Sequence, residues 1–552
     1  MRGRLILGAF FLLYLGLLME SADAQTAYVY LCADSVPAVN EPYQKDERTY
    51  DRDAIEPSIT GLEKVLYMQT KDVNWYLFSL SVPKDEPATL YLTLPNAESI
   101  TTAYLNGEPL SASQPVLVDL SETAELHLAT RETRLLTRLC FTNLPILCFT
   151  YGDTLTREDQ AATLVYIDPD YAAHGMAEAK MTTDALISLR GNSSANYTEK
   201  RPYNFSLMQD GEKWDTSLAG LRRDSDWLLD AAFSDASRMR NRVCMDVWDD
   251  VYALPWDETL SGATDGVYVE VFVNGRYKGL YVLGEKQDRT QLGLKNAASG
   301  QQGVIFRTTD TYGAEGASPA GFYSTGAKNP GETNVLSWYN VEIKFPKEPY
   351  CSEDTWEDFY NLTCLVVKGT DEEFVKGIAD YVSLDNLADY YLFANALNLN
   401  DNMRKNMTFA AYDAADEQQD TLILLPWDMD ASLGRAYSSL KTKSKTMTNR
   451  LFERLLSTDA GGFRSLLYAR WQALKAGALS LENIMGYFEG YYEVITRAGA
   501  LSREMDAHPT FTSYLEGAYG FTLNVQKDIA YIRDFLTAHL AWWDAEMTAL
   551  AQ

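Results

Sequence analysis

The segment from Asn400 to Asn406 has residue types that could catalyse transfer of a phosphoryl group. It reads Asn-Asp-Asn-Met-Arg-Lys-Asn, so Asp401 and Asn406 stand in a D-x-x-x-x-N spacing. At this spacing an Asp can orient an attacking hydroxyl and accept its proton, while the Asn reaches a metal ion. Arg404 or Lys405 could neutralise charge that develops on the phosphate. The spacing also arises by chance, and an Asp/Asn-rich loop without chemistry is the alternative.

A second acidic segment contains Asp428 and Asp430, directly after the strand-like run of residues 423–425. In protein kinases the metal-binding Asp follows the catalytic loop beyond a short strand pair, and Asp428 stands at that position after Asp401. Carboxylate oxygens are the ligands that a hard cation prefers, and Asp430 could add to them. The alternative is an exposed turn. The apolar residues 425–427 argue against it, because carboxylates without partners are costly in apolar surroundings.

A basic segment earlier in the chain could bind phosphates. After the strand-like residues 187–189 comes a turn of small residues that starts at Arg190 and includes Ser193 and Ser194, and such a turn can present backbone N–H groups to a phosphate. Lys200 and Arg201 follow at the start of the next expected strand. The alternative is a polar hairpin with exposed cations.

The elements around these segments are expected to be strands first and helices later. Short alternating runs over residues 25–140, separated by turn signals, predict a β-sandwich. A hairpin over residues 268–283 turns at Asn274-Gly275. It leads to Glu285 and Lys286, where a kinase-like chain would cross between its lobes and meet adenine. Residues 297–350 look loop-dominated, and residues 407–412 and 421–425 look like a strand pair. Helices are expected over residues 234–251, from 383 to 397, and over 451–456, 463–474, 481–498 and 525–550.

The first 24 residues have the pattern of a secretory signal. Arg2 and Arg4 precede an uncharged run over residues 5–19, and a small-x-small cleavage pattern ends at Ala24. The run is shorter than the roughly 20 apolar residues that a spanning helix needs, and an uncleaved signal anchor is the alternative. We therefore expect a secreted or cell-surface protein that has no membrane contact after cleavage.

The composition argues against several classes of function. The 552 residues carry a formal net charge of −29, whereas non-specific nucleic-acid binding needs a basic surface. The four histidines share no metal-ligand spacing, which argues against an H-E-x-x-H zinc hydrolase and weakens a Ser-His-Asp proposal. Cys140 with Cys148, or Cys351 with Cys364, could form disulfides or remain buried thiols. A site for a polyanion such as ATP must be locally positive, or be made so by metal ions.

Taken together, these segments resemble the spore-coat H (CotH) kinase family of secreted atypical protein kinases. The similarity spans about residues 144–550 and follows the family's order. The matching segments are residues 189–194 with 200–203, 234–241, 269–283 with 285–286, 400–406, and 426–430 with Gly434.

The resemblance implies an α+β, two-lobed atypical protein-kinase-like fold with a β-rich N-lobe and a helical C-lobe. It also implies use of ATP with Mg²⁺, or with Mn²⁺ or Ca²⁺, to phosphorylate protein hydroxyls. By position, Asp401 matches the catalytic Asp, and Asn406 and Asp428 match the metal ligands. The nucleotide-binding basic pair, commonly two lysines, is Lys200-Arg201 here. We favour Lys200, a compact point donor, as the phosphate ligand. The expected helix over residues 234–251 contains no Glu that could pair with it.

These expectations give a domain plan and leave two alternative functions. The expected partner is an extracellular or surface protein substrate, and the sequence does not determine the oligomeric state. The alternatives are a catalytically silent CotH-like surface, adhesion or structural protein, and a carbohydrate-associated extracellular module. The expected segments are a signal peptide (1–24), a β-sandwich accessory domain (25–142) and a kinase-like domain (143–552), the last divided into an N-lobe (143–290), a loop-rich insertion (297–350) and a helical C-lobe (351–552).

Overall fold

A computed structural model gives the fold, which is mixed α+β in the residues that it describes. The expected signal segment, residues 1–24, lies outside these residues, whereas all six cysteines lie within them as free thiols. The described residues are 28–33, 56–70, 73–81, 88–94, 97–110, 115–120, 122–131, 134–152, 154–191, 194, 198–296, 303–309, 319–414, 420–436, 441–511 and 521–550.

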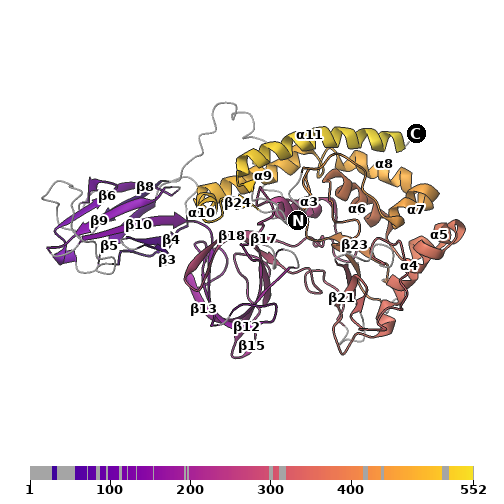
Figure 1. Ribbon diagram of the computed structural model, residues 1–552, viewed down its shortest axis with the longest axis horizontal. Helices are drawn as coiled ribbons and strands as arrows, with labels where there is room; N and C mark the ends of the chain where they lie inside the picture. The colour runs from indigo at the N-terminus through magenta and orange to yellow at the C-terminus, as the bar shows by residue number, and fades with distance from the viewer. Residues whose placement is uncertain are drawn as a thin grey trace.

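Two β-sheets over residues 28–142 share the first hydrophobic core. Buried side chains from both sheets, such as Val29, Phe78, Leu92 and Leu126, form one cluster. Both sheets lie at one end of the molecule in Figure 1. In spatial order one sheet consists of β2 (Ser58–Ile59), β5 (Ala88–Thr93), β1 (Tyr28–Ala33) and β8 (Val116–Asp119), and the other of β3 (Lys64–Gln69), β4 (Val73–Ser79), β10 (Arg134–Thr142), β9 (Ala124–Ala129), β6 (Thr102–Leu105) and β7 (Glu108–Pro109), with the 3-10 turn η1 (Ala97–Ser99) before β6.

The larger of these sheets is apolar on both faces. Successive residues of a strand point to opposite faces, so Phe78 of β4 lies in the first core while Leu77 packs in a second cluster with Phe272. The rings of Tyr67 and Tyr277 meet edge to face there, with centroids 4.9 Å apart. An apolar interface therefore joins the N-terminal sheets to the next part of the chain.

The central sheet closes on itself around a third cluster of buried side chains, which includes Trp227 and Tyr281. Closure arises because β13 pairs with both β12 and β14. Asn274 and Gly275 have φ angles of 48° and 71°, as a type I′ turn requires, which confirms the expected hairpin. The order is β13 (Lys180–Leu189), β12 (Gln160–Ile167), β11 (Ile146–Thr150), β17 (Gly266–Val273), β18 (Arg276–Glu285), β16 (Asp226–Asp230), β14 (Tyr203–Gln209) and β15 (Glu212–Lys213).

A third sheet combines strands from two distant parts of the chain. The expected strand pair is confirmed as β22 and β23, but the loop-dominated prediction for residues 297–350 is wrong in part, because three strands lie there. Of these short strands, β19 pairs with β22, a partner about a hundred residues away that no local pattern reveals, and β21 and β20 follow on its other side. The order is β20 (Ser337–Trp338), β21 (Val341–Phe345), β19 (Val304–Thr308), β22 (Met407–Ala411) and β23 (Ile423–Pro426).

Helices dominate the C-terminal part and surround the largest core, and α11 extends along α8 and α9 (Figure 1). No helix in the described ranges is long and apolar enough to cross a membrane. Ser383 caps α6, since its Oγ accepts the Asn386 N–H at 3.3 Å. The helices are α3 (Arg240–Val251), α4 (Glu357–Lys368), α5 (Asp371–Gly377), α6 (Leu384–Ala396), α7 (Arg450–Thr458), α8 (Phe463–Leu474), α9 (Leu481–Arg497), α10 (Ala500–Ala507) and α11 (Val525–Leu550), with 3-10 turns η3 (Glu353–Trp356), η4 (Ile378–Asp380) and η5 (Ala460–Gly462) and a small hairpin of β24 (Thr510–Phe511) and β25 (Phe521–Thr522).

The expected helix over residues 234–251 begins only at Arg240. The six residues before it form a loop in which Arg238 has a φ of 64°, a left-handed conformation that no helix contains. Helices α4, α5 and α10 lie in the part expected to be helical (351–552), but their individual bounds were not predicted, whereas α8 and α11 have the expected bounds.

Candidate functional site

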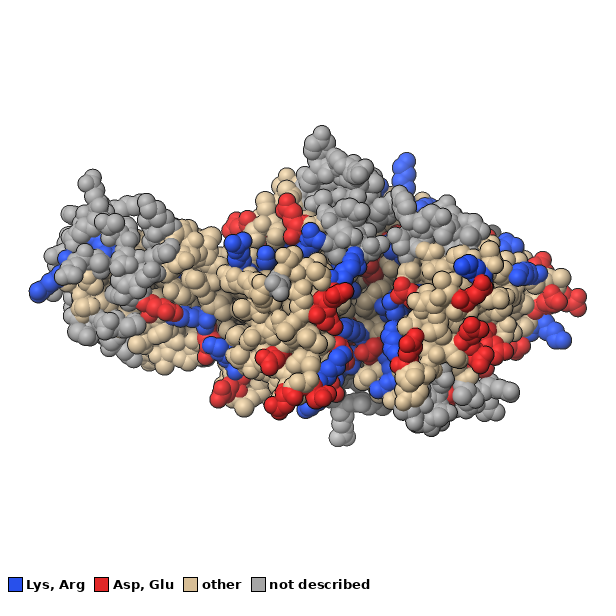
Figure 2. All heavy atoms as spheres, turned by 60° about the horizontal axis from the view of Figure 1, so that its bottom comes forward, with Lys and Arg blue, Asp and Glu red and all other residues tan. Residues whose placement is uncertain are grey.

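A cleft of about 870 Å³ lies between the closed central sheet and the third sheet. One wall is built from the ends of β13, β14 and β16, and the other from β19, β21 and the segments around residues 401–406 and 427–430. Figure 2 shows Lys, Arg, Asp and Glu side chains on both sides of a hollow near the middle of the molecule. Clefts between two parts of a fold are common ligand sites, and here the walls are strongly charged.

Most of the site residues expected from the sequence line this cleft, although they come from segments far apart in the chain. Ser193 lies outside the described residues. Three other candidates, Arg201, Glu285 and Arg404, are described but do not line the cleft. Those that do are Arg190, Ser194, Lys200, Lys286, Asp401, Lys405, Asn406, Asp428 and Asp430.

The three candidates outside the cleft have other contacts. The backbone carbonyl of Arg201 accepts a hydrogen bond from the Tyr281 hydroxyl at 2.9 Å. The Glu285 carboxylate is buried 3.4 Å from Arg222 Nε. The Arg404 guanidinium lies 5.1 Å from the centroid of the Tyr323 ring. None of these three residues is therefore placed among those that line the cleft.

A compact turn after α6 holds Asp401 and Asn406. The Lys405 N–H donates to the Asp401 carbonyl at 3.1 Å, and Lys405 Nζ lies 2.8 Å from the Asp401 carboxylate. Asn406 has a φ of 61°, a conformation that Asn adopts more readily than most residues. Its Nδ2 donates to the Asp428 carbonyl at 3.2 Å, so the amide oxygen is the atom that it can offer to a cation.

Asp428 and Asp430 bring two carboxylates to the end of β23. Asp428 is exposed to the cleft, whereas Asp430 is half-buried and accepts a hydrogen bond from Ser234 Oγ at 2.8 Å. Enclosure by the cleft walls raises the pKa of Asp428, and the cations of Lys405 and Arg190 oppose that rise. Burial, followed by the charge of Asp428, raises the pKa of Asp430 well above its ordinary value. A cation bound between the two groups would relieve this repulsion.

The oxygen atoms here fit a hard cation that is bound together with phosphate. Within the part of the chain that the structure describes, no three His, Cys, Asp or Glu side chains come close enough to hold a metal ion alone. Mg²⁺, however, usually takes one or two carboxylates and completes its shell with water and substrate phosphates. Asp428, Asp430 and the Asn406 amide supply such a set.

Lys200 forms a buried ion pair whose partner the sequence did not locate. Its Nζ lies 2.9 and 3.0 Å from the two carboxylate oxygens of Glu504 in α10, and neither side chain is exposed. Arg238 Nε and the Leu280 N–H each donate to the same carboxylate at 2.9 Å. Although burial raises the pKa of Glu504, the charges of Lys200 and Arg238 lower it below its ordinary value. Glu504 is therefore ionised at neutral pH and orients the Lys200 ammonium group.

Two arginines and a tryptophan form a neighbouring part of the cleft. The guanidinium carbon of Arg307, on β19, lies 4.2 Å from the centroid of the Trp427 ring, and that of Arg190 lies 6.0 Å away. Arg307 also donates to the side-chain oxygen of Gln287 at 2.8 Å. Burial, followed by repulsion from Arg190, lowers the pKa of Arg307 to about 10. This local excess of positive charge suits an anionic ligand. Arg307 was missed from the sequence because its stretch was expected to be a loop.

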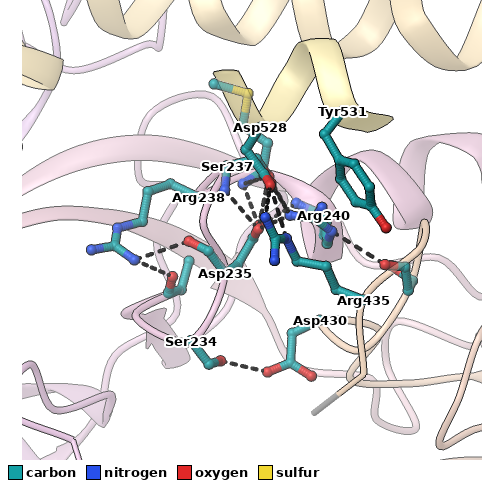
Figure 3. Close-up of polar contacts among 12 residues, drawn as sticks. Ser234, Asp235, Ser237, Arg238, Arg240, Asp430, Arg435, Asp528 and Tyr531 are labelled. Atoms are coloured by element: carbon teal, nitrogen blue, oxygen red, sulfur yellow. Dashed lines mark hydrogen bonds and ion pairs between the residues drawn. The ribbon is translucent and has the colours of Figure 1, made fainter. Parts of the chain in front are cut away.

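The loop before α3 connects Asp430 to the helices behind the cleft (Figure 3). Ser234 donates to Asp430, and the next residue, Asp235, accepts the Arg240 N–H at 2.7 Å. The Arg240 guanidinium pairs with Asp235 and lies 2.5 Å from the carboxylate of Asp528 in α11. The loop that binds Asp430 is thereby fixed by buried charges of the loop itself, of α3 and of α11.

Comparison with known proteins gives the family of the chain. Residues 187–543 match the family described as CotH kinase protein. That range contains every candidate site residue that lines the cleft, including the newly found Arg307, and it also contains Glu504, the buried partner of Lys200. No curated protein matches the chain. Since the matched range covers more than half of the chain, the protein belongs to the CotH kinase family.

Proposed function

We propose that the protein is a secreted atypical protein kinase that transfers the γ-phosphoryl group of ATP to Ser or Thr hydroxyls of proteins. The observation that carries this proposal is the meeting of Asp401, Asn406 and Asp428 with the Lys200–Glu504 pair around one cleft. Phosphoryl transfer depends mainly on positioning and on charge stabilisation, and these residues provide both.

Asp401 is the proposed contact for the protein hydroxyl. Its carboxylate would orient the hydroxyl in line with the γ-phosphorus and accept the hydroxyl proton. The bond from that phosphorus to the bridging oxygen breaks as the new P–O bond forms, and ADP leaves with the electron pair. Lys405 Nζ, 2.8 Å from the Asp401 carboxylate, would stabilise the negative charge that develops on the transferring phosphoryl group.

Four cations are the proposed contacts for the nucleotide phosphates. Lys200 is fixed by Glu504, Arg190 and Arg307 lie beside Trp427, and Lys286 also lines the cleft. A divalent cation held by Asn406, Asp428 and Asp430 would supply additional positive charge to the phosphates.

The architecture supports a two-lobed arrangement. We assign the closed central sheet to the N-lobe and the helical part from residue 351 to the C-lobe, and residues 25–142 to a β-sandwich accessory domain with its own core. Residues 1–24 are the proposed export signal. Export would place the kinase where ATP is scarce, so nucleotide must be obtained during or after export.

The test is transfer of label from γ-labelled ATP with Mg²⁺ or Mn²⁺ to the protein itself or to casein. Asp401→Asn and Asp428→Asn should each lower labelling about a hundredfold or more, because a base or a cation ligand is lost. Asp544→Asn is the control, since Asp544 of α11 pairs with Lys475 outside the cleft. Equal labelling by all four proteins would contradict the proposal. No labelling at all, with a rise in melting temperature on adding ATP and metal, would instead support the catalytically silent alternative.

A further inference from the structure

Helix α10 carries two adjacent buried charges that point toward different parts of the molecule. Glu504 binds Lys200 in the cleft, as described above. The residue before it, Arg503, points about a quarter turn away on the helix and is only 7% exposed. The same short helix packs along β18, which supplies the Leu280 N–H that binds Glu504. Any shift of α10 would therefore move the partner of Lys200.

Arg503 binds the central sheet and the N-terminal sheets together. Its Nε and Nη2 donate to the two carboxylate oxygens of Glu270, on β17, at 2.8 and 2.6 Å. Its Nη1 donates to the carbonyl of Phe141, on β10, at 3.2 Å. The remaining bond is from Nη2 to the Ala498 carbonyl at 2.7 Å, next to the start of α10. One guanidinium thus fixes the helix against two sheets.

The contact with β10 belongs to a larger interface. Phe141 is the last but one residue of β10, and the next-door residue Cys140 lies in the cluster that contains Leu77 and Phe272. Tyr277, whose hydroxyl donates to Glu270 at 2.8 Å, packs at the edge of that cluster. A residue of the interface with the N-terminal sheets therefore also binds the Glu270 carboxylate, which in turn binds Arg503.

We propose that Arg503 is a positioning residue through which the N-terminal sheets hold α10, and with it Glu504, at Lys200. This extends the proposed kinase function, because it makes residues 28–142 part of the apparatus that binds nucleotide. A bidentate Arg–Glu pair suits this role, since its planar geometry fixes orientation as well as distance.

The first measurement needs no nucleotide: amide hydrogen exchange of Leu280 in the full chain. Arg503→Met should speed this exchange at least about fivefold, because Glu504 loses its fixed position, and Arg503→Lys should restore part of the protection. The matched control is Arg454→Met. Arg454 is 3% exposed and donates to Asp371 and to the carbonyls of Leu365 and Val366, away from the cleft. Unchanged exchange in Arg503→Met, or an equal rise in Arg454→Met, would overturn the proposal.

A second pair of variants tests whether the N-terminal sheets position α10. This pair also tests the proposal if Arg503→Met does not fold. Leu77→Ala loosens the interface, whereas Leu92→Ala opens a cavity only in the first core; both side chains are fully buried. Leu280 should lose protection in Leu77→Ala and keep it in Leu92→Ala. The same protection in both variants would show that the interface does not position α10.

Kinetics then separate positioning from general stability. In Arg503→Met the KM for ATP should rise about fivefold or more while kcat changes less, with partial rescue in Arg503→Lys. An unchanged KM despite faster Leu280 exchange would overturn the functional part of the proposal. If the unmutated protein transfers no phosphoryl group, that result contradicts only the proposed kinase function. Amide hydrogen exchange of Leu280 tests the structural role of Arg503 without any need for transfer.

Discussion

Gly279 of β18 lies where any β-carbon would collide with the Glu504 carboxylate. Its φ is 109°, and a β-carbon built there would come within 3.1 Å of Lys200 Cε and closer still to Glu504 Oε2. Gly279→Ala should therefore push Glu504 away from Lys200 without removing any ionisable group from the protein.

The expected effect has two parts. Backbone strain at a positive φ costs about 1–3 kcal/mol. Separating a buried ion pair costs about 3–5 kcal/mol, because both charges stay buried without their partner. If about 3 kcal/mol of this cost destabilises the transition state of phosphoryl transfer, kcat/KM for ATP should fall about a hundredfold. The melting temperature should fall as well.

The control is Gly275→Ala in the turn of the same hairpin. Gly275 also has a positive φ, of 71°, but a β-carbon there would meet no atom within 4 Å. Gly275→Ala should introduce the backbone strain without the collision. Its melting temperature should therefore fall, while its kcat/KM for ATP stays unchanged. The assay is steady-state kinetics with varied ATP, next to thermal melting of the three proteins without nucleotide. If Gly279→Ala keeps the kcat/KM of Gly275→Ala, the Lys200–Glu504 pair does not position the phosphates.

Two further substitutions test the electrostatics of the cleft and of its support. Arg307→Gln should raise the KM for ATP about 10- to 100-fold, since a charged hydrogen bond to phosphate contributes about 1.5–3 kcal/mol; an unchanged KM would remove Arg307 from the site. Asp528→Asn should lower the melting temperature by several degrees, because Asp528 is bound by both Arg240 and Arg435 and a broken buried pair costs about 3–5 kcal/mol. Asp534→Asn, at an exposed position of the same helix, is its control, and equal melting of the two variants would contradict the expectation.

Local sequence patterns predicted the helices in which apolar residues recur at a regular spacing. The apolar spacing in residues 463–474 and 525–550 matches α8 and α11, because a long amphipathic helix carries its own signal. The short strands β19 to β21 carried no such signal, since β19 is stabilised by pairing with the distant β22, and β21 and β20 pair in turn beside it. The start of α3 was misplaced because Asp235 accepts hydrogen bonds from the Ser237 and Met239 N–H groups of the loop before the helix, and from that of Arg240 where the helix begins.

The sequence by itself determined the acidic part of the cleft. Asp401, Asn406 and Asp428 lie on two segments joined by one strand pair, so their spacing along the chain nearly fixes their spacing in space. Only the tertiary structure decided which acid binds Lys200 and that Arg307 joins the basic part of the cleft. Lys200 and Glu504 are 304 residues apart, and a Glu on a short helix resembles any surface Glu until α10 packs on β18. Burial excludes water from that pair, and burial is a property of the packed chain rather than of any segment.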